Sequence, residues 1–491
     1  MAACSTLTRR LIHVRLAAIR PRFSGQYAPL RVTPTDAACS ACRDAGDMGL
    51  AKTALVASLL LVAAPSAQAG MTTPRVVSPP GLAVQEHSVA AGGGRTAIAM
   101  SGLTGSPRAA HGAVYARLGR VTTLGPSVRL STGRGESPTV AVGADGTAVA
   151  AWTDPKAGLR VAIAAPGEPF GAVQTVRPDA PADKPSRIGG AAVTPSGRVI
   201  IAWRTGGTVQ VSIAPPLHPI ETTTAIGVAR QYSPSISLGL GGTAVVAWLD
   251  TPQAPLPPPN TVNPGPAHVR ASTLTEGSPA FSAPTDLGSV AYWPAGATTG
   301  GGPGGALVNW RGDTGFSLSR LSLSGVFSTP IDAPSSTADG KSALATDASG
   351  AAVALWRTVT YVGGDDLETV ISAQTFASVA PAGGSFGPAL PLSTAGWIPD
   401  TPHIAAMPDR TFAAWEERSG NHTAHIQVAI RKPYGAWRRL APLGVPDQGD
   451  QRGMTVQVGG DAHHAPVTWI SYAGVKDSSF GGRLVRSTYR P

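Results

Sequence analysis

Gly146-Thr147-Ala148-Val149-Ala150-Ala151-Trp152 is the stretch that decides the fold, because close copies of it recur along the chain. A typical copy has a turn residue, a run of small and β-branched apolar residues, and a final Trp. The copies end at Trp152, Trp203, Trp248, Trp310, Trp356, Trp415 and Trp469, and an eighth ends at Met100. We call the Trp or Met that ends each copy its anchor. Successive anchors lie 52, 51, 45, 62, 46, 59 and 54 residues apart. A period of about fifty residues is typical of a repeat architecture.

The second repeat unit shows what each unit forms. Residues 138–142, 148–152, 159–164 and 170–176 are four apolar runs separated by turn residues, which predicts a four-stranded antiparallel meander. In the second run Val149 and Ala151 point to one side and Trp152 to the other, so both faces are apolar. A strand buried on both faces lies between two neighbouring sheets. The sequence therefore predicts an all-β fold, a β-propeller of four-stranded antiparallel blades.

The number of anchors predicts eight blades. The last unit lacks a fourth strand, and residues 74–80 form an extended segment that we expect to supply it, since pairing the two ends of the domain removes two exposed edges. Seven blades is the alternative, if the first or fifth unit does not form. Aromatic residues are expected to open the fourth strand of their units, and these are Phe170, Phe281, Phe327, Phe386 and Trp437. The Pro-rich residues 252–266 and the Gly-rich residues 298–305 are predicted to be surface loops.

The N-terminal region has the pattern of an export signal. Lys52 precedes an apolar run at residues 54–64, and Ala67-Gln68-Ala69 has the small-x-small pattern of a cleavage site. Residues 48–69 are therefore predicted to be a signal peptide, and residues 70–491 a single β-propeller domain. Residues 1–47 are interpreted as a leader that is disordered or that precedes the natural start at Met48; the alternative is a long n-region. All three cysteines, Cys4, Cys39 and Cys42, lie in this leader.

Composition excludes some classes of function. The chain has 59 Gly and 45 Pro and is only 14% charged, which suits short strands joined by turns. Its net charge of +10 falls to +5 without residues 1–69, and its arginines are scattered. Nucleic-acid binding normally needs a clustered basic surface, so we expect no nucleic-acid partner. The apolar run near the N-terminus is too short to span a membrane, so we expect no transmembrane anchor.

The repeat ending at Trp152, followed by Val-Ala-Ile-Ala at residues 161–164 and by Phe170, resembles the repeats of secreted bacterial β-propeller proteins of sialidase-like architecture. The resemblance covers residues 71–491 and implies a propeller fold. The sequence departs from true sialidases in two ways. Their Asp-box turns place Gly three residues before Trp, whereas the spacing here is usually six, and their Arg-Ile-Pro motif is missing.

Charged residues follow the predicted strands that end in the repeated Trp. In a propeller, loops from several blades lie together at this end of the strands. Arg204, Arg311 and Arg357 directly follow a Trp, and acids within three residues of one are Asp154, Asp250, Asp313, Glu416 and Glu417. The arginines are candidates for binding a carboxylate, with Asp154, Asp250 and Glu416 as candidate catalytic acids. The alternative interpretation is that these residues are solvated charges at strand ends.

Loops that enter each blade contain a second set of candidates. Tyr232, Tyr292, Trp293, Trp397 and Asp400 lie in these loops, and Trp293 and Trp397 are tryptophans outside the repeat positions. Exposed aromatic rings suit sugar stacking, but packing between blades explains them equally well. We expect no metal site and no cofactor, since His422, His425, His463 and His464 lack a third ligand and the acidic residues 365–368 are a weak calcium signal.

These observations together predict a secreted or cell-surface β-propeller that acts as a binding or interaction scaffold. Its expected ligand is a carbohydrate, or a protein of the cell surface, and the protein is expected to be a monomer. A sialidase-like glycoside hydrolase is the alternative. The candidate ligand-binding residues are Tyr232, Trp293, Trp397 and Asp400.

Overall fold

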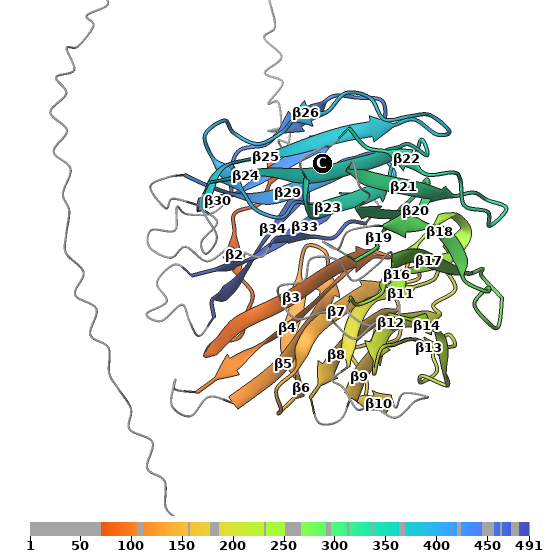
Figure 1. The fold of residues 1–491 in the computed structure, drawn as a ribbon. Helices are drawn as coiled ribbons and strands as arrows, with labels where there is room; N and C mark the ends of the chain where they lie inside the picture. Colours follow the sequence, from red (N-terminus) through yellow and green to blue (C-terminus); the bar gives the residue numbers. More distant parts are fainter. Residues whose placement is uncertain are drawn as a thin grey trace, which may run out of the picture. The chain divides into compact units, whose positions relative to one another are not determined.

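The strands form eight antiparallel sheets, each of which is one blade of a β-propeller (Figure 1). This computed structural model describes residues 70–105, 111–155, 158–176, 186–229, 232–250, 267–290, 296–311, 315–334, 338–362, 369–419, 424–443, 456–461, 464–472 and 481–490. The chain divides into two units, Met1–Ala64 and Pro65–Pro491, and all eight sheets lie in the second. The predicted leader and signal peptide lie outside the described residues.

The first four blades follow one another along the chain. Blade 1 contains β3 (Leu82–Gly92), β4 (Arg95–Thr104), β5 (His111–Arg120) and β6 (Leu124–Ser131). Blade 2 contains β7 (Glu136–Val142), β8 (Ala148–Asp154), β9 (Gly158–Ala164) and β10 (Gln174–Val176). Blade 3 contains β11 (Arg187–Val193), β12 (Val199–Thr205), β13 (Thr208–Ala214) and β14 (Thr222–Val228). Blade 4 contains β15 (Ser235–Leu238), β16 (Ala244–Asp250), β17 (Ala267–Leu274) and β18 (Thr285–Val290), with the short 3₁₀ turn η1 (Leu240–Gly242) after β15.

The last four blades complete the ring. Blade 5 contains β19 (Thr298–Gly302), β20 (Gly305–Arg311), β21 (Phe316–Leu321) and β22 (Ile331–Asp332). Blade 6 contains β23 (Ala338–Thr346), β24 (Ala352–Val362), β25 (Thr369–Ala380) and β26 (Leu390–Pro391). Blade 7 contains β27 (Ile398–Pro399), β28 (His403–Ala406), β29 (Thr411–Arg418), β30 (Ala424–Arg431) and β31 (Trp437–Arg439). Blade 8 contains β32 (Val456–Val458), β33 (Ala465–Ser471) and β34 (Arg483–Arg490), joined by β1 (Gly70–Met71) and β2 (Arg75–Val76).

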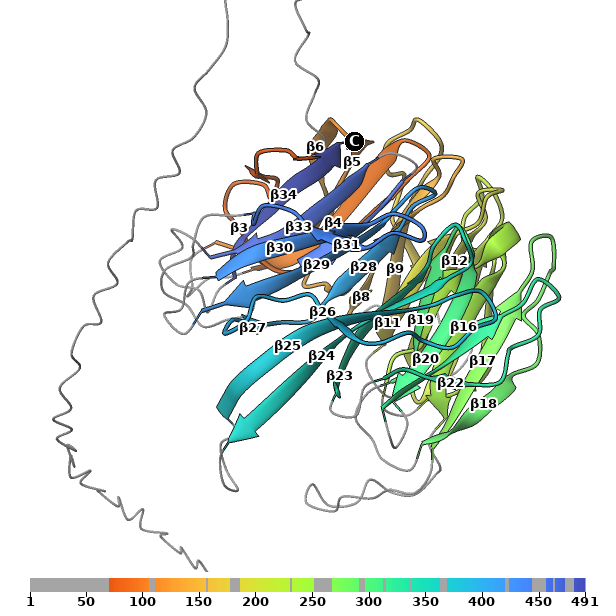
Figure 2. The same ribbon diagram turned by 90° about the horizontal axis from the view of Figure 1, so that it is seen from above.

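The blades close into a ring of eight. The first full strands of successive blades contact one another from β3 and β7 through β28 and β32, and blade 8 then contacts β3. In Figure 2 the dark blue strands β33 and β34 accordingly lie beside the orange strands of blade 1. The prediction of eight blades is confirmed, and the seven-blade alternative is excluded because both the first and the fifth unit form complete sheets.

The ring closes by a shared blade, as the sequence predicts. The outer strand of blade 8 comes from the N-terminal side of the domain, where β1 and β2 pair antiparallel with β34 (Figure 1). Arg75 lies opposite Arg486, and Val76 lies opposite Val485. The sheet therefore joins residues separated by more than four hundred positions, and the edge of β34 is paired rather than exposed.

The repeated tryptophans bind each blade to the one before it. Trp203 of blade 3 packs in one cluster with Val149 and Val161 of blade 2, and Trp469 of blade 8 packs with Phe412 of blade 7. At the seam Met100 of blade 1 packs with residues of blade 8. The anchors all have their side chains buried between two sheets, which explains why both faces of the strand are apolar.

One sequence expectation about loops is wrong. Residues 298–302 of the Gly-rich segment form β19, the first strand of blade 5, rather than a surface loop. Glycine is required there because the backbones of neighbouring blades come very close. A Cβ atom at Gly301 would lie 2.2 Å from the carbonyl oxygen of Leu238 in blade 4, and one at Gly302 would lie 2.0 Å from that of Thr346 in blade 6. The Pro-rich residues 252–266 lie outside the described residues.

A second difference concerns the start of the fourth strands. Only Trp437 lies within its strand, whereas Phe170, Phe281, Phe327 and Phe386 precede theirs. The residue after each of these phenylalanines donates one backbone hydrogen bond to the third strand, as Gly171 N does to Ile163 O over 2.9 Å. The phenylalanine packs against the core before continuous pairing starts, so an aromatic residue marks the approach to the strand rather than its first residue.

Replacing Trp356 by Ala tests the packing between blades. Trp356 is 1% exposed and packs with Leu307 and Phe316 of blade 5. The substitution leaves a cavity, so it should lower the free energy of unfolding by about 3–5 kcal/mol. Urea unfolding followed by fluorescence measures the change. Leu323→Ala, at a side chain that is 84% exposed, is the control and should change little. A loss below about 1 kcal/mol for Trp356→Ala contradicts burial between blades.

Candidate functional site

The propeller has two faces that differ in the connections they carry. On one, which we call the turn face, lie the turns between first and second strands and between third and fourth strands. On the other, the loop face, lie the connections between second and third strands and between blades. This arrangement follows from the antiparallel order in every sheet. The charged residues predicted after each Trp are at the loop face.

The six candidate charged residues come from six different blades. Asp154 in blade 2 lies with Oδ2 3.9 Å from Nε of Arg160 on the next strand, and Asp250 in blade 4 lies with Oδ2 3.8 Å from Nε of Arg270. Arg204 in blade 3 donates to the carbonyl of Ala229 at 3.4 Å, and Arg311 ends β20 in blade 5. Arg357 and Glu416, in blades 6 and 7, are the two that the structure brings into one group of charges.

That group is centred on Asp400, where blades 6 and 7 meet. Lys341 Nζ lies 2.8 Å from Asp400 Oδ1, and Arg357 Nη1 lies 3.5 Å from the same oxygen. Arg418 Nη2 lies 3.5 Å from Asp400 Oδ2, and its Nε contacts Glu416 Oε1. We call these five residues the Asp400 cluster. It contains three cations and two carboxylates, so it carries a net charge of +1.

The charges in this cluster keep Asp400 ionised. Burial by itself would raise the pKa of the Asp400 carboxyl group, but the hydrogen bond and charge of Lys341, the backbone N–H of Thr401 and the charge of Arg357 outweigh it. The pKa is therefore about 2. Asp400 is a carboxylate at neutral pH, and it accepts hydrogen bonds rather than donating a proton.

Beside the cluster lies a buried carboxylate network around Glu417. The Glu417 side chain is 0% exposed. It accepts hydrogen bonds from Thr394 N at 2.9 Å, Thr394 Oγ1 at 2.6 Å and Trp415 Nε1 at 2.8 Å. His425 Nε2 and Arg439 Nη2 lie 3.3 and 3.4 Å from its Oε2. Burial alone would raise the pKa of Glu417, but the adjacent His425 ring and the hydrogen bonds from Thr394 and Trp415 lower it to about 2.

The aromatic residues that were candidates for sugar stacking have different surroundings. Trp397 is half-buried and lies against His425, with ring centroids 4.5 Å apart and planes at 58°. It precedes β27, the strand that ends one residue before Asp400, so it lies next to the Asp400 cluster in the chain. Tyr232 packs instead against the core between blades 4 and 5, where burial raises the pKa of its hydroxyl group. Trp293 lies outside the described residues, together with Tyr292, Asp313 and the acidic residues 365–368.

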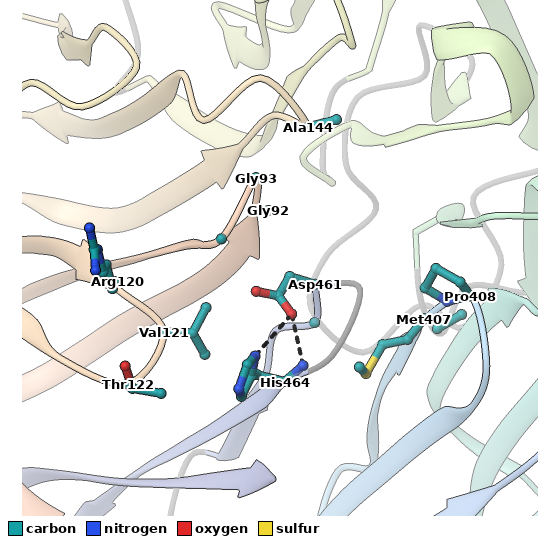
Figure 3. Close-up of a pocket in the computed structure, with 13 residues that line it drawn as sticks. Gly92, Gly93, Arg120, Val121, Thr122, Ala144, Met407, Pro408, Asp461 and His464 are labelled. Atoms are coloured by element: carbon teal, nitrogen blue, oxygen red, sulfur yellow. Dashed lines mark hydrogen bonds and ion pairs between the residues drawn. The ribbon is translucent and has the colours of Figure 1, made fainter. Parts of the chain in front are cut away.

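A pocket of about 560 Å³ opens on the turn face (Figure 3). Turns of blades 1, 2, 7 and 8 line it, with the apolar side chains of Val121, Met407 and Pro408 and the exposed end of Arg120. Asp461 Oδ1 accepts a hydrogen bond from His464 N at 2.7 Å and lies 3.6 Å from His464 Nδ1. This volume suits a small ligand. This pocket could not be predicted from the sequence, because its residues come from short turns with no shared motif.

The described residues contain neither a cluster of metal ligands nor a membrane-spanning helix. No set of three or more His, Cys, Asp or Glu side chains lies close enough together to hold a metal ion within those residues. Within the same part of the chain, no helical segment is both long and apolar enough to cross a bilayer.

The eight closed blades define the chain as a β-propeller protein. No protein-family model and no curated protein matches its sequence. Solved structures do resemble it. The polysaccharide lyase Uly1 is 10% identical with a TM-score of 0.43, covering 85% of this chain and 91% of that one. The β-propeller domain of the trilobed protease of Pyrococcus furiosus is 9% identical with a TM-score of 0.40, covering 75% and 98%.

Sialidase-like propellers are among the structural neighbours. A mutant of the NanB sialidase of Streptococcus pneumoniae is 8% identical with a TM-score of 0.35, covering 85% of this chain and 70% of that one. These neighbours differ from one another in activity, and none of the similarities indicates what this chain does. The functional argument therefore depends on the site itself.

The Glu417 network predicts a specific loss of stability in acid. A carboxyl group whose pKa is lower in the folded protein contributes stability above its unfolded pKa and loses it as the pH falls through the folded pKa. For Glu417 the loss should run from about pH 5 to about pH 2. Glu417→Gln should lower the free energy of unfolding at pH 7 by roughly 2–3 kcal/mol and flatten the dependence on pH in that window.

Urea unfolding at pH 7 and at pH 4 measures both effects. Glu136→Gln is the matched control, because its side chain is 47% exposed and pairs with Arg134, which is itself exposed. It should change stability by less than about 1 kcal/mol. An unchanged stability of Glu417→Gln at pH 7 contradicts the buried network.

Proposed function

We propose that this protein is an exported binding protein that holds a carbohydrate on the loop face of its propeller, at the junction of blades 6 and 7. Trp397 would supply an apolar ring surface for a sugar ring, and the Asp400 cluster would supply donors and acceptors for hydroxyl groups. The export signal predicted at residues 48–69 supports a role outside the cytoplasm. A surface protein of the cell is the alternative ligand.

The observation that carries this proposal is the ionisation of two carboxyl groups, those of Asp400 and Glu417. Hydrolysis of a glycosidic bond needs a carboxylic acid whose pKa is raised, so that it holds a proton at neutral pH. At this junction Asp400 and Glu417 have the opposite property, with pKa values of about 2. Ionised groups that are held in place by several partners suit the recognition of a polar ligand better than proton transfer.

A glycoside hydrolase is the second candidate, and one observation favours it. Asp400 and Glu416 both contact the guanidinium group of Arg418, so two carboxylates lie in one cluster. Glycosidases use a pair of carboxyl groups about 5–9.5 Å apart. Glu416 is the residue in this pair to test as a catalytic acid, because it is 1% exposed.

A glycan-array screen of recombinant residues 70–491, combined with fluorogenic glycosides on the same preparation, tests the proposal. We expect saturable binding to a glycan without turnover. Trp397→Ala should weaken binding about tenfold or more, because losing one stacked ring costs about 1.4 kcal/mol. The control is Tyr434→Ala, an 87% exposed aromatic residue in the turn between β30 and β31, on the turn face of the same blade. It should bind normally.

The other outcomes distinguish the alternatives. Turnover that is lost in Glu416→Gln would establish a hydrolase and contradict a pure binding role. Glycan binding that is equally weakened by Trp397→Ala and Tyr434→Ala would place the ligand elsewhere. Neither binding nor turnover on a broad array would contradict both carbohydrate functions.

A further inference from the structure

Four arginines meet at the seam where the propeller closes. A pocket of about 660 Å³ lies there, and Arg75, Arg117, Arg486 and Arg490 line it. Its other polar lining comes from threonines, and within the described part of the chain no Asp or Glu is among the lining residues. Arg75, Arg486 and Arg490 belong to the shared blade 8, and Arg117 belongs to β5 of blade 1.

Two of these arginines are held rigidly by neutral groups. Arg117 donates from Nε to the carbonyl of Gly125 at 2.8 Å and from Nη1 to that of Val77 at 3.0 Å. Arg486 donates from Nε to Thr488 Oγ1 at 3.1 Å and from Nη2 to the carbonyl of Val121. A guanidinium group has five N–H donors, so each keeps donors beyond those used in these bonds. Their positions are set by the fold and not by a negative partner.

The positive charges also repel one another. Arg75 lies directly opposite Arg486 in the β2–β34 pair, and like charges in such a position destabilise a sheet. Burial, together with the charges of Arg117 and Arg490, lowers the pKa of Arg486 to about 10, which still leaves it protonated at pH 7. The repelling side chains of Arg75 and Arg486 belong to β2 and β34, the two strands whose pairing closes the ring.

Single arginines elsewhere in the propeller have two kinds of partner: Arg95, Arg198 and Arg320 also donate to backbone carbonyl groups, whereas others contact an acid. Arg160, Arg270, Arg357, Arg418 and Arg431 each lie within ion-pair distance of a carboxylate. For the four seam arginines, no ion pair is found among the residues described. Because a cluster of uncompensated guanidinium groups with spare donors is suited to an oxyanion, the missing negative charge points to a ligand.

We infer that the seam pocket binds an oxyanion, such as a sulfate, phosphate or carboxylate group, between the guanidinium groups of Arg75, Arg117, Arg486 and Arg490. Threonine hydroxyls of the lining add neutral donors. Such a ligand neutralises the repulsion between the paired strands, so its binding stabilises the closed ring. This site is in blades 8 and 1, separate from the proposed carbohydrate site between blades 6 and 7.

Sodium sulfate and inorganic phosphate are the first probes, with sodium chloride at matched ionic strength as the salt control. We expect saturable binding by calorimetry and a rise in melting temperature with sulfate that chloride does not reproduce. In the Arg75→Gln/Arg490→Gln double variant, affinity should fall at least tenfold and the sulfate-dependent rise should disappear. Both side chains are exposed, so this variant should fold.

Removing two repelling charges should also leave the ligand-free double variant at least as stable as the unmodified protein. The stability of the ligand-free double variant therefore distinguishes the two roles. If the arginines served only the structure, removing them would lower that stability. The matched control is Arg187→Gln/Arg438→Gln, which removes two exposed arginines from blades 3 and 7 and has the same net charge. It should respond to sulfate as the unmodified protein does.

A sulfated oligosaccharide and its unsulfated counterpart identify the source of the oxyanion. Tighter binding of the sulfated oligosaccharide than of free sulfate, lost in the double variant, would identify a substituent on a polymer; no gain over free sulfate would identify a small free anion. Equal sulfate responses in both double variants and the unmodified protein would overturn the inference. Trp397→Ala should leave the sulfate response intact, so failure of the carbohydrate proposal does not affect this test.

Discussion

The structure depends on the burial of one side chain per blade against the preceding blade. Trp203 contacts blade 2, Trp356 contacts blade 5, and the same direction holds around the ring to Met100, which contacts blade 8. A blade that presents an apolar strand on both faces is not stable alone, because both faces would be exposed, and the end blades of an open stack would still expose one face each. Blade 1 must therefore pack against blade 8, so burial of the apolar faces requires the ring to close.

Closure makes the seam chemically different from the other junctions. Blade 8 is assembled from both sides of the domain, so its outer strand follows a different sequence pattern from the repeat. The seam pocket, with its four arginines, is located there. Blade 7 departs from the pattern in another way, since its Trp is followed by two acids and an arginine, and the Asp400 cluster and the Glu417 network form around them. Both candidate sites thus lie where the repeat is interrupted.

The sequence predicted the architecture well because the relevant information is local and repeated. Eight anchors predict eight blades, and an incomplete last unit predicts its completion by residues 74–80. The Gly-rich β19 could not be predicted as a strand, because the reason for its glycines is the backbone of neighbouring blades. The same limit applies to the sites. Arg357, Glu416 and Asp400 were candidates, and Arg418 follows Glu416 by two residues, but Lys341 joins them only in the folded structure. Likewise, Arg75 meets Arg486 across the whole length of the domain.

An engineered disulfide across the seam tests closure most directly. Val77 N donates to Leu484 O at 2.8 Å, so Val76 and Val485 form the adjacent, closely spaced pair that suits a disulfide. Residues 70–491 contain no cysteine. Val76→Cys/Val485→Cys should form an intramolecular bond on oxidation, detected by mass spectrometry of a non-reducing digest, and should raise the unfolding midpoint. The control pair Val76→Cys/Val228→Cys, which places the second thiol in blade 3, should remain reduced. Free thiols in the seam variant, or equal bond formation in both variants, would contradict a propeller closed by its N-terminal strand.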